Sequence, residues 1–270
     1  MTSVMPILVL IATATAVTFA AEVKMQVRDG LPIVDGVFIN GHGPHRFLLD
    51  TGTNVNLIDK SLAHSIGLDP TFHSELSSSS GVTVAPGGDG IRISLSSVEA
   101  GEQKFLFLPL DAIHKHWPDV EGVLGQWFLS QFDYRIDLHG RRLEISKHDE
   151  NEMPTNAGTR APFRMFNGRP LVTTSLGDLV LDSGSTRLVL FGVQPDPGFS
   201  PVEHQLRTVA GSVNIGMVFT KQLVIEGRRD WRGHAVAVPH PSESGVGGLL
   251  PLNLFKAITV CNSRSYVVFE

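Results

Sequence analysis

Residues 47–53 read Phe-Leu-Leu-Asp-Thr-Gly-Thr, and residues 179–185 read Leu-Val-Leu-Asp-Ser-Gly-Ser. Each copy of this pattern is an apolar run followed by an aspartate, a small hydroxyl residue, a glycine and another hydroxyl residue. The two aspartates, Asp50 and Asp182, lie 182 − 50 = 132 residues apart in a chain of 270 residues. A matched pair with one copy in each half predicts two similar units that each present one carboxylate to a shared site.

Other segments repeat in the same order around these motifs. Asp-Gly-Leu-Pro-Ile-Val at 29–34 precedes the first motif, and Asn-Gly-Arg-Pro-Leu-Val at 167–172 precedes the second. Downstream, residues 122–129 match residues 248–255, and these loops follow the aspartates by 125 − 50 = 75 and 251 − 182 = 69 residues. Two copies in one order and at nearly equal spacing indicate an internal duplication.

Most of the remaining sequence is typical of β-strands. Short runs rich in Val, Ile, Leu and Phe are separated by Gly, Ser and Pro. Examples are residues 91–95, 104–108, 213–219 and 235–238. Helical spacing is rarer: it predicts a helix over 58–67 that ends at a glycine cap, and short helices over 126–132 and 252–258. We therefore expect an all-β fold with a few short helices.

The duplication also divides the chain. Residues 148–160 are polar and rich in structure-breaking residues, which predicts a linker between an N-terminal lobe at 22–147 and a C-terminal lobe at 161–270. Residues 6–21 are almost wholly apolar and small, so we expect residues 1–21 to be a signal peptide and the protein to be exported, periplasmic or secreted. The alternative is an uncleaved membrane anchor, because residues before the apolar stretch carry no Lys or Arg.

Composition excludes several classes of function. The formal net charge is −5, and the sequence has no basic patch that would indicate a nucleic-acid partner. Cys261 is the only cysteine, so no intramolecular disulfide is possible, and we expect a buried inert thiol. His114 and His116 have no third ligand at a useful spacing, so no metal site is expected there.

The paired motifs make the chain resemble the pepsin/retropepsin aspartic peptidases, in the bacterial-type form with two retropepsin-like repeats in one chain. The resemblance rests on each Asp-Thr/Ser-Gly-Thr/Ser motif and on the apolar loop that follows it, at 123–125 and at 249–251. It implies two β-barrel-like lobes related by a pseudo-twofold axis, with a substrate cleft between them. It also implies a monomeric aspartic endopeptidase that acts on peptides or proteins without a cofactor.

The two residue types fit the chemistry of peptide hydrolysis. Two carboxylates about 3 Å apart cannot both ionise cheaply, so they share one proton and supply a base and an acid together. The resemblance implies that Asp50 and Asp182 hold the attacking water between them. One carboxylate then acts as the base while the other, protonated, donates to the scissile carbonyl, which predicts an acidic pH optimum.

The resemblance assigns supporting roles as well. Thr51 and Ser183 would cross-link the two loops at the lobe interface. Thr53 and Ser185 would hydrogen-bond the outer carboxylate oxygens, which favours the ionised form of one aspartate.

The glycines of the motifs have a separate purpose. Gly52 and Gly184 would each let a backbone N–H approach its own carboxylate without a Cβ in the way. Pro251 stands where the first half has Gly125, so the second loop cannot make the same backbone contacts.

A glycine-rich segment predicts a mobile cover over the cleft. We expect a first flap over residues 80–93 with its tip at 86–90, so that Gly87 and Gly88 contact the substrate. A counterpart around residues 209–218 would allow a second flap.

Three other classes of protein share part of this sequence pattern. Actin-like ATPases and sugar kinases need more helices than this sequence offers, and haloacid dehalogenases need a second acid where this chain has glycine. The remaining alternative is a peptide-binding module of the same fold that has lost turnover, because a misplacement of about 1 Å can cost around a hundredfold in rate.

Overall fold

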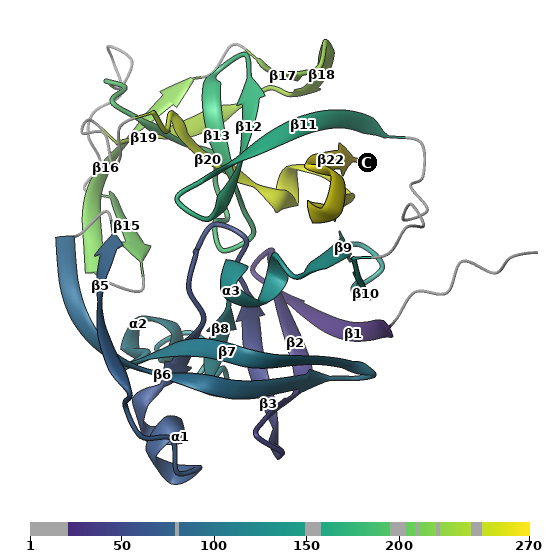
Figure 1. Ribbon diagram of the computed structural model, residues 1–270. Helices are drawn as coiled ribbons and strands as arrows, with labels where there is room; N and C mark the ends of the chain where they lie inside the picture. Colours follow the sequence, from purple (N-terminus) through teal and green to yellow (C-terminus); the bar gives the residue numbers. More distant parts are fainter. Residues whose placement is uncertain are drawn as a thin grey trace, which may run out of the picture.

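The computed structural model describes residues 21–78, 81–148, 158–194, 204–208, 211–219, 222–238 and 245–270. Within them the chain consists mostly of β-strands with a few short helices, which confirms the expected all-β class (Figure 1). Most of the predicted signal peptide and of the predicted linker lies outside the described residues. None of the helices in the described part of the chain is long and apolar enough to cross a membrane.

The N-terminal half forms a closed barrel. Its elements are β1 (Ala21–Arg28), β2 (Leu31–Ile39), β3 (His42–Leu49), β4 (Leu57–Asp59), α1 (Lys60–Ser65), β5 (Phe72–Ser78), β6 (Gly81–Leu95), β7 (Val98–Leu108), α2 (Asp111–His114), β8 (Gly122–Leu124), α3 (Gln126–Leu129), β9 (Phe132–Asp137) and β10 (Arg142–Lys147). Hydrogen-bonded pairs run from β2 through β3, β8, β4, β7 and β6 and back to β2. This ring encloses an apolar core.

The C-terminal half repeats this order of strands. Its elements are β11 (Thr159–Phe166), β12 (Arg169–Thr174), β13 (Gly177–Asp182), β14 (Val189–Phe191), β15 (His204–Thr208), β16 (Gly211–Phe219), β17 (Leu223–Ile225), β18 (Arg228–Trp231), β19 (His234–Val238), β20 (Gly248–Pro251), the 3-10 helix Leu252–Leu254, β21 (Ala257–Cys261), the 3-10 helix Asn262–Arg264 and β22 (Tyr266–Phe269). The pairs run from β12 through β13, β20, β14 and β19 to β16. In the described residues β16 does not return to β12, so this ring stays open, and β17 and β18 form a separate hairpin.

A third sheet joins the two halves. Its order is β1, β10, β9, β21, β22 and β11, with three strands from each half. The central pair, β9 with β21, is antiparallel and places Ile136 opposite Ile258. Figure 1 shows this shared sheet at the right, between the lower N-terminal half and the upper C-terminal half. Since each half supplies matching strands around the central pair, the arrangement has the pseudo-twofold symmetry expected of the fold.

The alternation of side chains explains why these segments form half-buried strands. In β1, Ala21, Val23 and Met25 face the core while Glu22 and Lys24 face solvent, as the period of two requires. All residues of β9 are buried, because this strand is central in the shared sheet.

The helices are shorter than the sequence predicts. The helix expected over 58–67 is α1, which begins after Asp59 caps its first N–H groups, while residue 58 belongs to β4. The helix expected over 126–132 ends at Leu129, where β9 soon begins. The one expected over 252–258 is a single 3-10 turn followed by β21. In each case pairing in a sheet overrides weak helical spacing.

The predicted flap tip is wrong. Gly87 and Gly88 lie inside β6, where Gly87 pairs with Phe72 on one side and with Leu106 on the other. A Cβ on Gly87 would lie 2.7 Å from the carbonyl oxygen of Phe105, so this glycine serves close packing of strands. The register shifts just after Gly88, as in a β-bulge. Residues 79–80, which connect β5 to β6 in the chain, lie outside the described residues.

Candidate active site

The two motif aspartates follow equivalent strands. Asp50 comes directly after β3, which runs parallel to β8, and its N–H donates to the carbonyl of Leu124 at 3.0 Å. Asp182 ends β13, which runs parallel to β20 and pairs with Pro251. The parallel neighbour holds the end of each strand, so both carboxylates project from rigid elements into the region where the halves meet.

Thr51 and Ser183 join the two motif loops. The Thr51 N–H donates to Ser183 Oγ at 2.9 Å, and the Ser183 N–H donates to Thr51 Oγ1 at 3.0 Å. Each hydroxyl then donates across the interface: Thr51 to the carbonyl of Leu181 at 2.8 Å, and Ser183 to the carbonyl of Leu49 at 2.7 Å. All four bonds are buried, and they form the cross-link that the resemblance implies.

The motif glycines bring the two aspartates together. The Gly52 N–H donates to Asp50 Oδ1 at 2.9 Å, and the Gly184 N–H donates to Asp182 Oδ1 at 2.8 Å. A Cβ on Gly52 would lie 2.4 Å from Cγ of Asp182, and one on Gly184 would lie 2.6 Å from Cγ of Asp50. Each glycine therefore makes room for the carboxylate of the other half as well as donating to its own.

The dyad is electrostatically uneven. Burial raises the pKa of Asp50, although the N–H groups of Gly52 and Thr53 and the neighbouring carboxyl act against this rise. Burial raises the pKa of Asp182 well above its usual value, and the nearby charge of Asp50 raises it further. These directions favour a pair of carboxyls that shares a single proton.

A residue that the sequence analysis missed acts on both carboxyls. The guanidinium of Arg169 lowers the pKa of Asp50 and of Asp182 through its charge. Arg169 is the first residue of β12, and the equivalent first residue of β2 is the buried Leu31. A comparison of the two copies for residues that differ could therefore have identified Arg169.

The predicted roles of the outer hydroxyl residues are wrong. Ser185 Oγ donates to the carbonyl of Arg187 at 2.9 Å and closes its own turn, so it does not reach Asp182. At Asp50 the supporting hydrogen bond comes from the Thr53 backbone N–H, and no bond from the Thr53 hydroxyl to Asp50 is found among the described residues. A hydroxyl directly after the motif glycine can bond to nearby backbone groups instead of the carboxylate, and Ser185 does so here.

Two hairpins remain as candidate covers. In the N-terminal half β5 and β6 pair from Phe72 to Ser78, and in the C-terminal half β15 and β16 pair from His204 to Thr208. Both hairpins lie on the left of Figure 1, opposite the shared sheet. Part of the predicted second flap, residues 209–210, lies outside the described residues.

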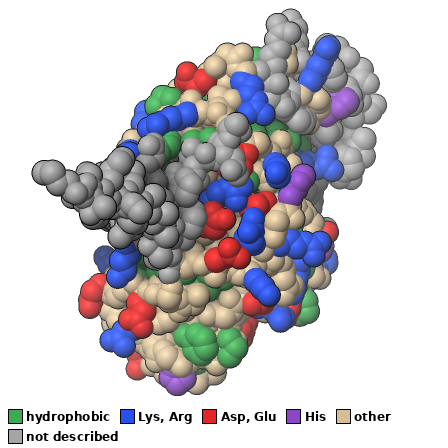
Figure 2. Space-filling model, turned by 90° about the vertical axis from the view of Figure 1, so that its right-hand side faces the viewer, with side chains coloured by type: hydrophobic (Ala, Val, Ile, Leu, Met, Phe, Trp, Pro, Cys, Tyr) green, Lys and Arg blue, Asp and Glu red, His purple; other side chains and the backbone are tan. Residues whose placement is uncertain are grey.

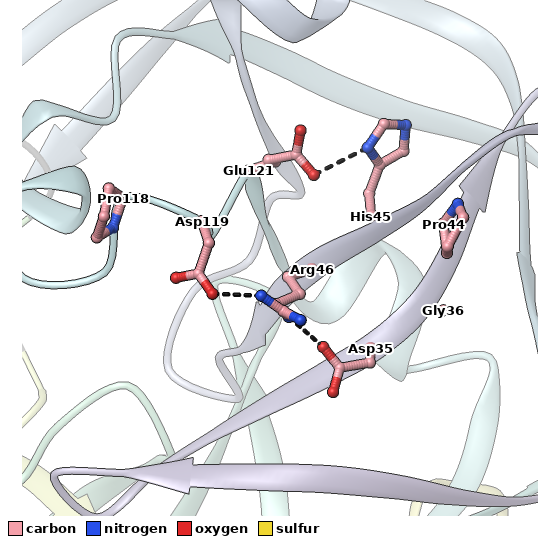
Figure 3. Close-up of a pocket in the computed structure, with 8 residues that line it drawn as sticks. All are labelled: Asp35, Gly36, Pro44, His45, Arg46, Pro118, Asp119 and Glu121. Atoms are coloured by element: carbon pink, nitrogen blue, oxygen red, sulfur yellow. Dashed lines mark hydrogen bonds and ion pairs between the residues drawn. The ribbon is translucent and has the colours of Figure 1, made fainter.

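A separate surface pocket has no part in the dyad. It has a volume of about 420 Å³ and lies beside β2 and β3. Arg46 bridges Asp35 and Asp119 there, and His45 Nδ1 lies 2.9 Å from Glu121 (Figure 3). Its charges are paired with one another, and none of its lining residues belongs to the two motifs.

The face that carries the shared sheet is mixed in charge. Figure 2 shows acidic and basic side chains interspersed on it. Within the described residues no three His, Cys, Asp or Glu side chains are grouped as metal ligands would be.

Comparisons with known proteins agree with this architecture. Residues 36–128, which include the first motif, match the aspartyl protease family model. The crystal structure of basic 7S globulin from soybean aligns over 92% of this chain and 94% of its own, with 9% identity and a TM-score of 0.54. A retropepsin-like aspartic protease from Rickettsia conorii aligns over 46% of this chain and 88% of its own, with 20% identity and a TM-score of 0.35.

A search of curated proteins gave no match in sequence. The family model covers the first motif, and the structural alignment covers nearly the whole chain, in which the second motif occupies the equivalent place. Both comparisons indicate the same fold. Residues 36–128 are therefore similar to the aspartyl protease family, and the chain as a whole has an acid-protease-like fold.

Proposed function

We propose that the protein is a monomeric aspartic endopeptidase that hydrolyses peptide bonds with a water activated between Asp50 and Asp182. One observation supports this most directly. Each carboxylate accepts an N–H from its own motif glycine and lies against the glycine of the other motif. This arrangement holds two buried carboxyls face to face, and such a pair binds a single proton at the pH where peptide hydrolysis by this chemistry proceeds.

The mechanism needs one ionised and one protonated carboxyl, and we assign the first role to Asp50 and the second to Asp182. Ionised Asp50 takes a proton from the water, and the protonated carboxyl of Asp182 donates its proton to the carbonyl oxygen of the scissile bond. The oxygen of the water then bonds to the carbonyl carbon and gives a tetrahedral diol. Asp50 then donates its proton to the departing nitrogen while Asp182 takes a proton from one hydroxyl of the diol. The C–N bond breaks, the amine and the carboxylic acid leave, and the pair regains its single proton on Asp182.

The substrate and the setting are part of the same proposal. The cleft that the family resemblance implies between the two lobes would suit an extended peptide or a flexible protein segment. The apolar start of the chain supports export to the periplasm or to the outside of the cell, with anchoring by that segment as the alternative.

A second candidate is a peptide-binding module without turnover. The hydroxyl of Ser185 is engaged elsewhere, and Asp50 is supported by the backbone N–H groups of Gly52 and Thr53 rather than by the Thr53 hydroxyl. The outer carboxylate oxygens are therefore less supported than the family resemblance implies, and precise support is what turnover requires.

Cleavage of a diverse peptide library by residues 22–270 between pH 3 and 8 tests the proposal, beside Asp50→Asn and Asp182→Asn. Wild-type turnover that disappears in both variants would support a one-chain dyad. A wild-type protein that binds a statine peptide but cleaves nothing at any pH would establish the binding module instead.

A further inference from the structure

The amide of Gln126 holds the catalytic loop of the N-terminal half. Gln126 is the first residue of α3 and is buried. Its Nε2 donates to the carbonyl oxygen of Thr51 at 2.8 Å, and this bond is buried too. Its Oε1 has no well-formed partner among the described residues, although Tyr134 lies beside it. The bond to Thr51 is thus the principal polar contact of this side chain.

The Thr51 carbonyl belongs to the same peptide group as the Gly52 N–H. A peptide group is planar, so fixing its oxygen fixes the direction of its N–H as well. That N–H donates to Asp50 Oδ1 at 2.9 Å. Gln126 therefore orients a donor to the proposed base without touching the carboxylate itself.

Other polar groups around α3 hold the same loop. The backbone N–H groups of Gln126 and Trp127 donate to the carbonyls of Thr53 and Asn54 at 3.0 and 3.1 Å. The side chain of Asn56 accepts the N–H of Gly125 at 2.9 Å. Together with the Gln126 amide, these bonds form a polar clamp from Thr51 to Asn56.

The C-terminal half replaces Asn56 and Gln126 with apolar residues and holds its loop with a different amide. Asn253 Nδ2 donates there to the carbonyl of Thr186 at 2.8 Å. Leu188 stands at the place of Asn56, six residues after the motif aspartate, and Pro251 stands at the place of Gly125. Proline has no N–H to offer, and the matching side chain has correspondingly lost its acceptor. Leu252 stands at the place of Gln126, and both leucines are buried.

We propose that Gln126 is a positioning residue for Asp50, and that the two halves hold their motif loops by different side chains. In the first half an amide fixes the carbonyl of Thr51, directly after the aspartate. In the second half Leu252 replaces that amide, and Asn253 binds the loop further on, at Thr186. This rests on the proposed peptidase function. In the first half, the side chain of Gln126 then sets the direction of the Gly52 N–H group that donates to Asp50.

Two variants test this role. Gln126→Leu introduces the residue of the other half and removes the donor, so we expect kcat to fall roughly ten- to hundredfold with little change in KM. Gln126→Glu keeps the shape, and only its protonated form can donate to the Thr51 carbonyl. Its activity should therefore approach that of the wild type at low pH and fall away at a lower pH than the wild type does.

Gln131→Leu is the matched control. Gln131 lies just beyond α3, is exposed, and donates its amide to the carbonyl of Trp127 at 2.9 Å without contacting the motif. We expect its kcat and pH profile to equal those of the wild type. Thermal unfolding of every variant at each assay pH separates a loss of folding from a loss of positioning.

The outcome can be told apart from failure of the proposed function. An active wild type whose Gln126→Leu variant keeps its kcat and pH profile would overturn the role of Gln126 alone. If the wild type shows no turnover, carboxyl ¹³C titration by NMR gives the answer. A higher pKa of Asp50 in Gln126→Leu would support the positioning role, because a donor to the ionised form is disturbed, and an unchanged pKa would refute it.

Discussion

Thr51 and Ser183 each accept a hydrogen bond from the backbone N–H of the other, at 3.0 and 2.9 Å, across the boundary between the two halves. Each hydroxyl also donates to a carbonyl that precedes the opposite aspartate. The relative position of the two carboxylates is therefore set by these two side chains, which are both buried.

Thr51→Val should uncouple the halves. It preserves the shape but leaves the Ser183 N–H and the Leu181 carbonyl without partners, which should destabilise the protein by about 2–5 kcal/mol. Thr51→Ser keeps the hydroxyl and loses one methyl group, so we expect the protein to be destabilised by only about 1 kcal/mol. Urea denaturation of both variants measures the difference, and equal stabilities would show that the hydroxyl does not join the loops.

Gly52→Ala should abolish activity. The added Cβ would lie 2.4 Å from Cγ of Asp182, so one carboxylate must move away from the other. We expect at least about a hundredfold loss of kcat/KM. Gly101→Ala is the control, since nothing lies within 4 Å of the Cβ added there. Wild-type activity in Gly52→Ala would mean that the two carboxylates do not need to be this close.

Stability should depend on pH through the dyad. The pKa of Asp182 is raised in the folded state, so the protonated form favours folding below the ordinary pKa and this stability is lost as pH rises through the folded value. Asp182→Asn removes the ionisation and should be more stable than the wild type at neutral pH. The gain should be about 1.4 kcal/mol for each tenfold difference in proton affinity, and it should vanish at acidic pH.

Asp178→Asn gives the opposite control for this measurement. The hydroxyl of Thr173 and the guanidinium of Arg164 lower the pKa of Asp178. Its stabilising effect is present above the ordinary pKa and is lost as pH falls through the folded value, so this variant should be less stable than the wild type at neutral pH. Thermal unfolding from pH 3 to 8 compares the two, and parallel curves would contradict the assigned directions.

Arg169→Leu should shift the pH dependence of the dyad. The charge of Arg169 lowers the pKa of both carboxyls, so replacing it with the residue found at position 31 should raise both values. The pH profile of kcat/KM should move to higher pH. Arg164→Leu should leave it in place, because that guanidinium bonds to Asp178 at 3.0 Å instead. An unmoved profile in Arg169→Leu would place its charge outside the site.

Arg135 and Glu270 should be strongly coupled in stability. Arg135 of β9 makes two hydrogen bonds to the Glu270 carboxylate, at 3.0 and 2.9 Å, and only 5% of each side chain is exposed. Glu270→Gln leaves the buried charge of Arg135 with a weaker partner. We expect the free energy of unfolding to fall by about 3–5 kcal/mol. Combining Arg135→Met with Glu270→Leu should recover part of it. Simple additivity in this double-mutant cycle would argue against a direct pair.

The sequence predicted the parts of the site that depend on duplication. Asp50, Asp182 and the cross-link between Thr51 and Ser183 occupy equivalent places in both copies, so a repeat with its chemistry was enough to identify them. The roles of Ser185 and Thr53 could not be read in the same way. A small hydroxyl can bond to several neighbours, and the path of the backbone decides which one.

The glycine-rich segment of β6 shows a different limit. Glycine permits both a turn and a close approach of strands, and sequence alone does not separate the two. Gly87 needs space beside Phe72, a neighbour that is known only once β5 and β6 are paired. Arg169 and Gln126 were missed for the reverse reason. They differ between the two copies of the repeat, so the residues that the copies share do not identify them.

The shared sheet has a consequence for how the protein is made. Residue 136 of β9 pairs with residue 258 of β21, 258 − 136 = 122 positions later, and β22 at the far end of the chain completes the sheet beside β11. A ribosome would release β21 only 122 residues after β9, so the sheet cannot close until both halves have been made. Contacts this distant in sequence form slowly. Asp50 and Asp182 would therefore come together late, because the sheet that joins their halves needs strands from both of them.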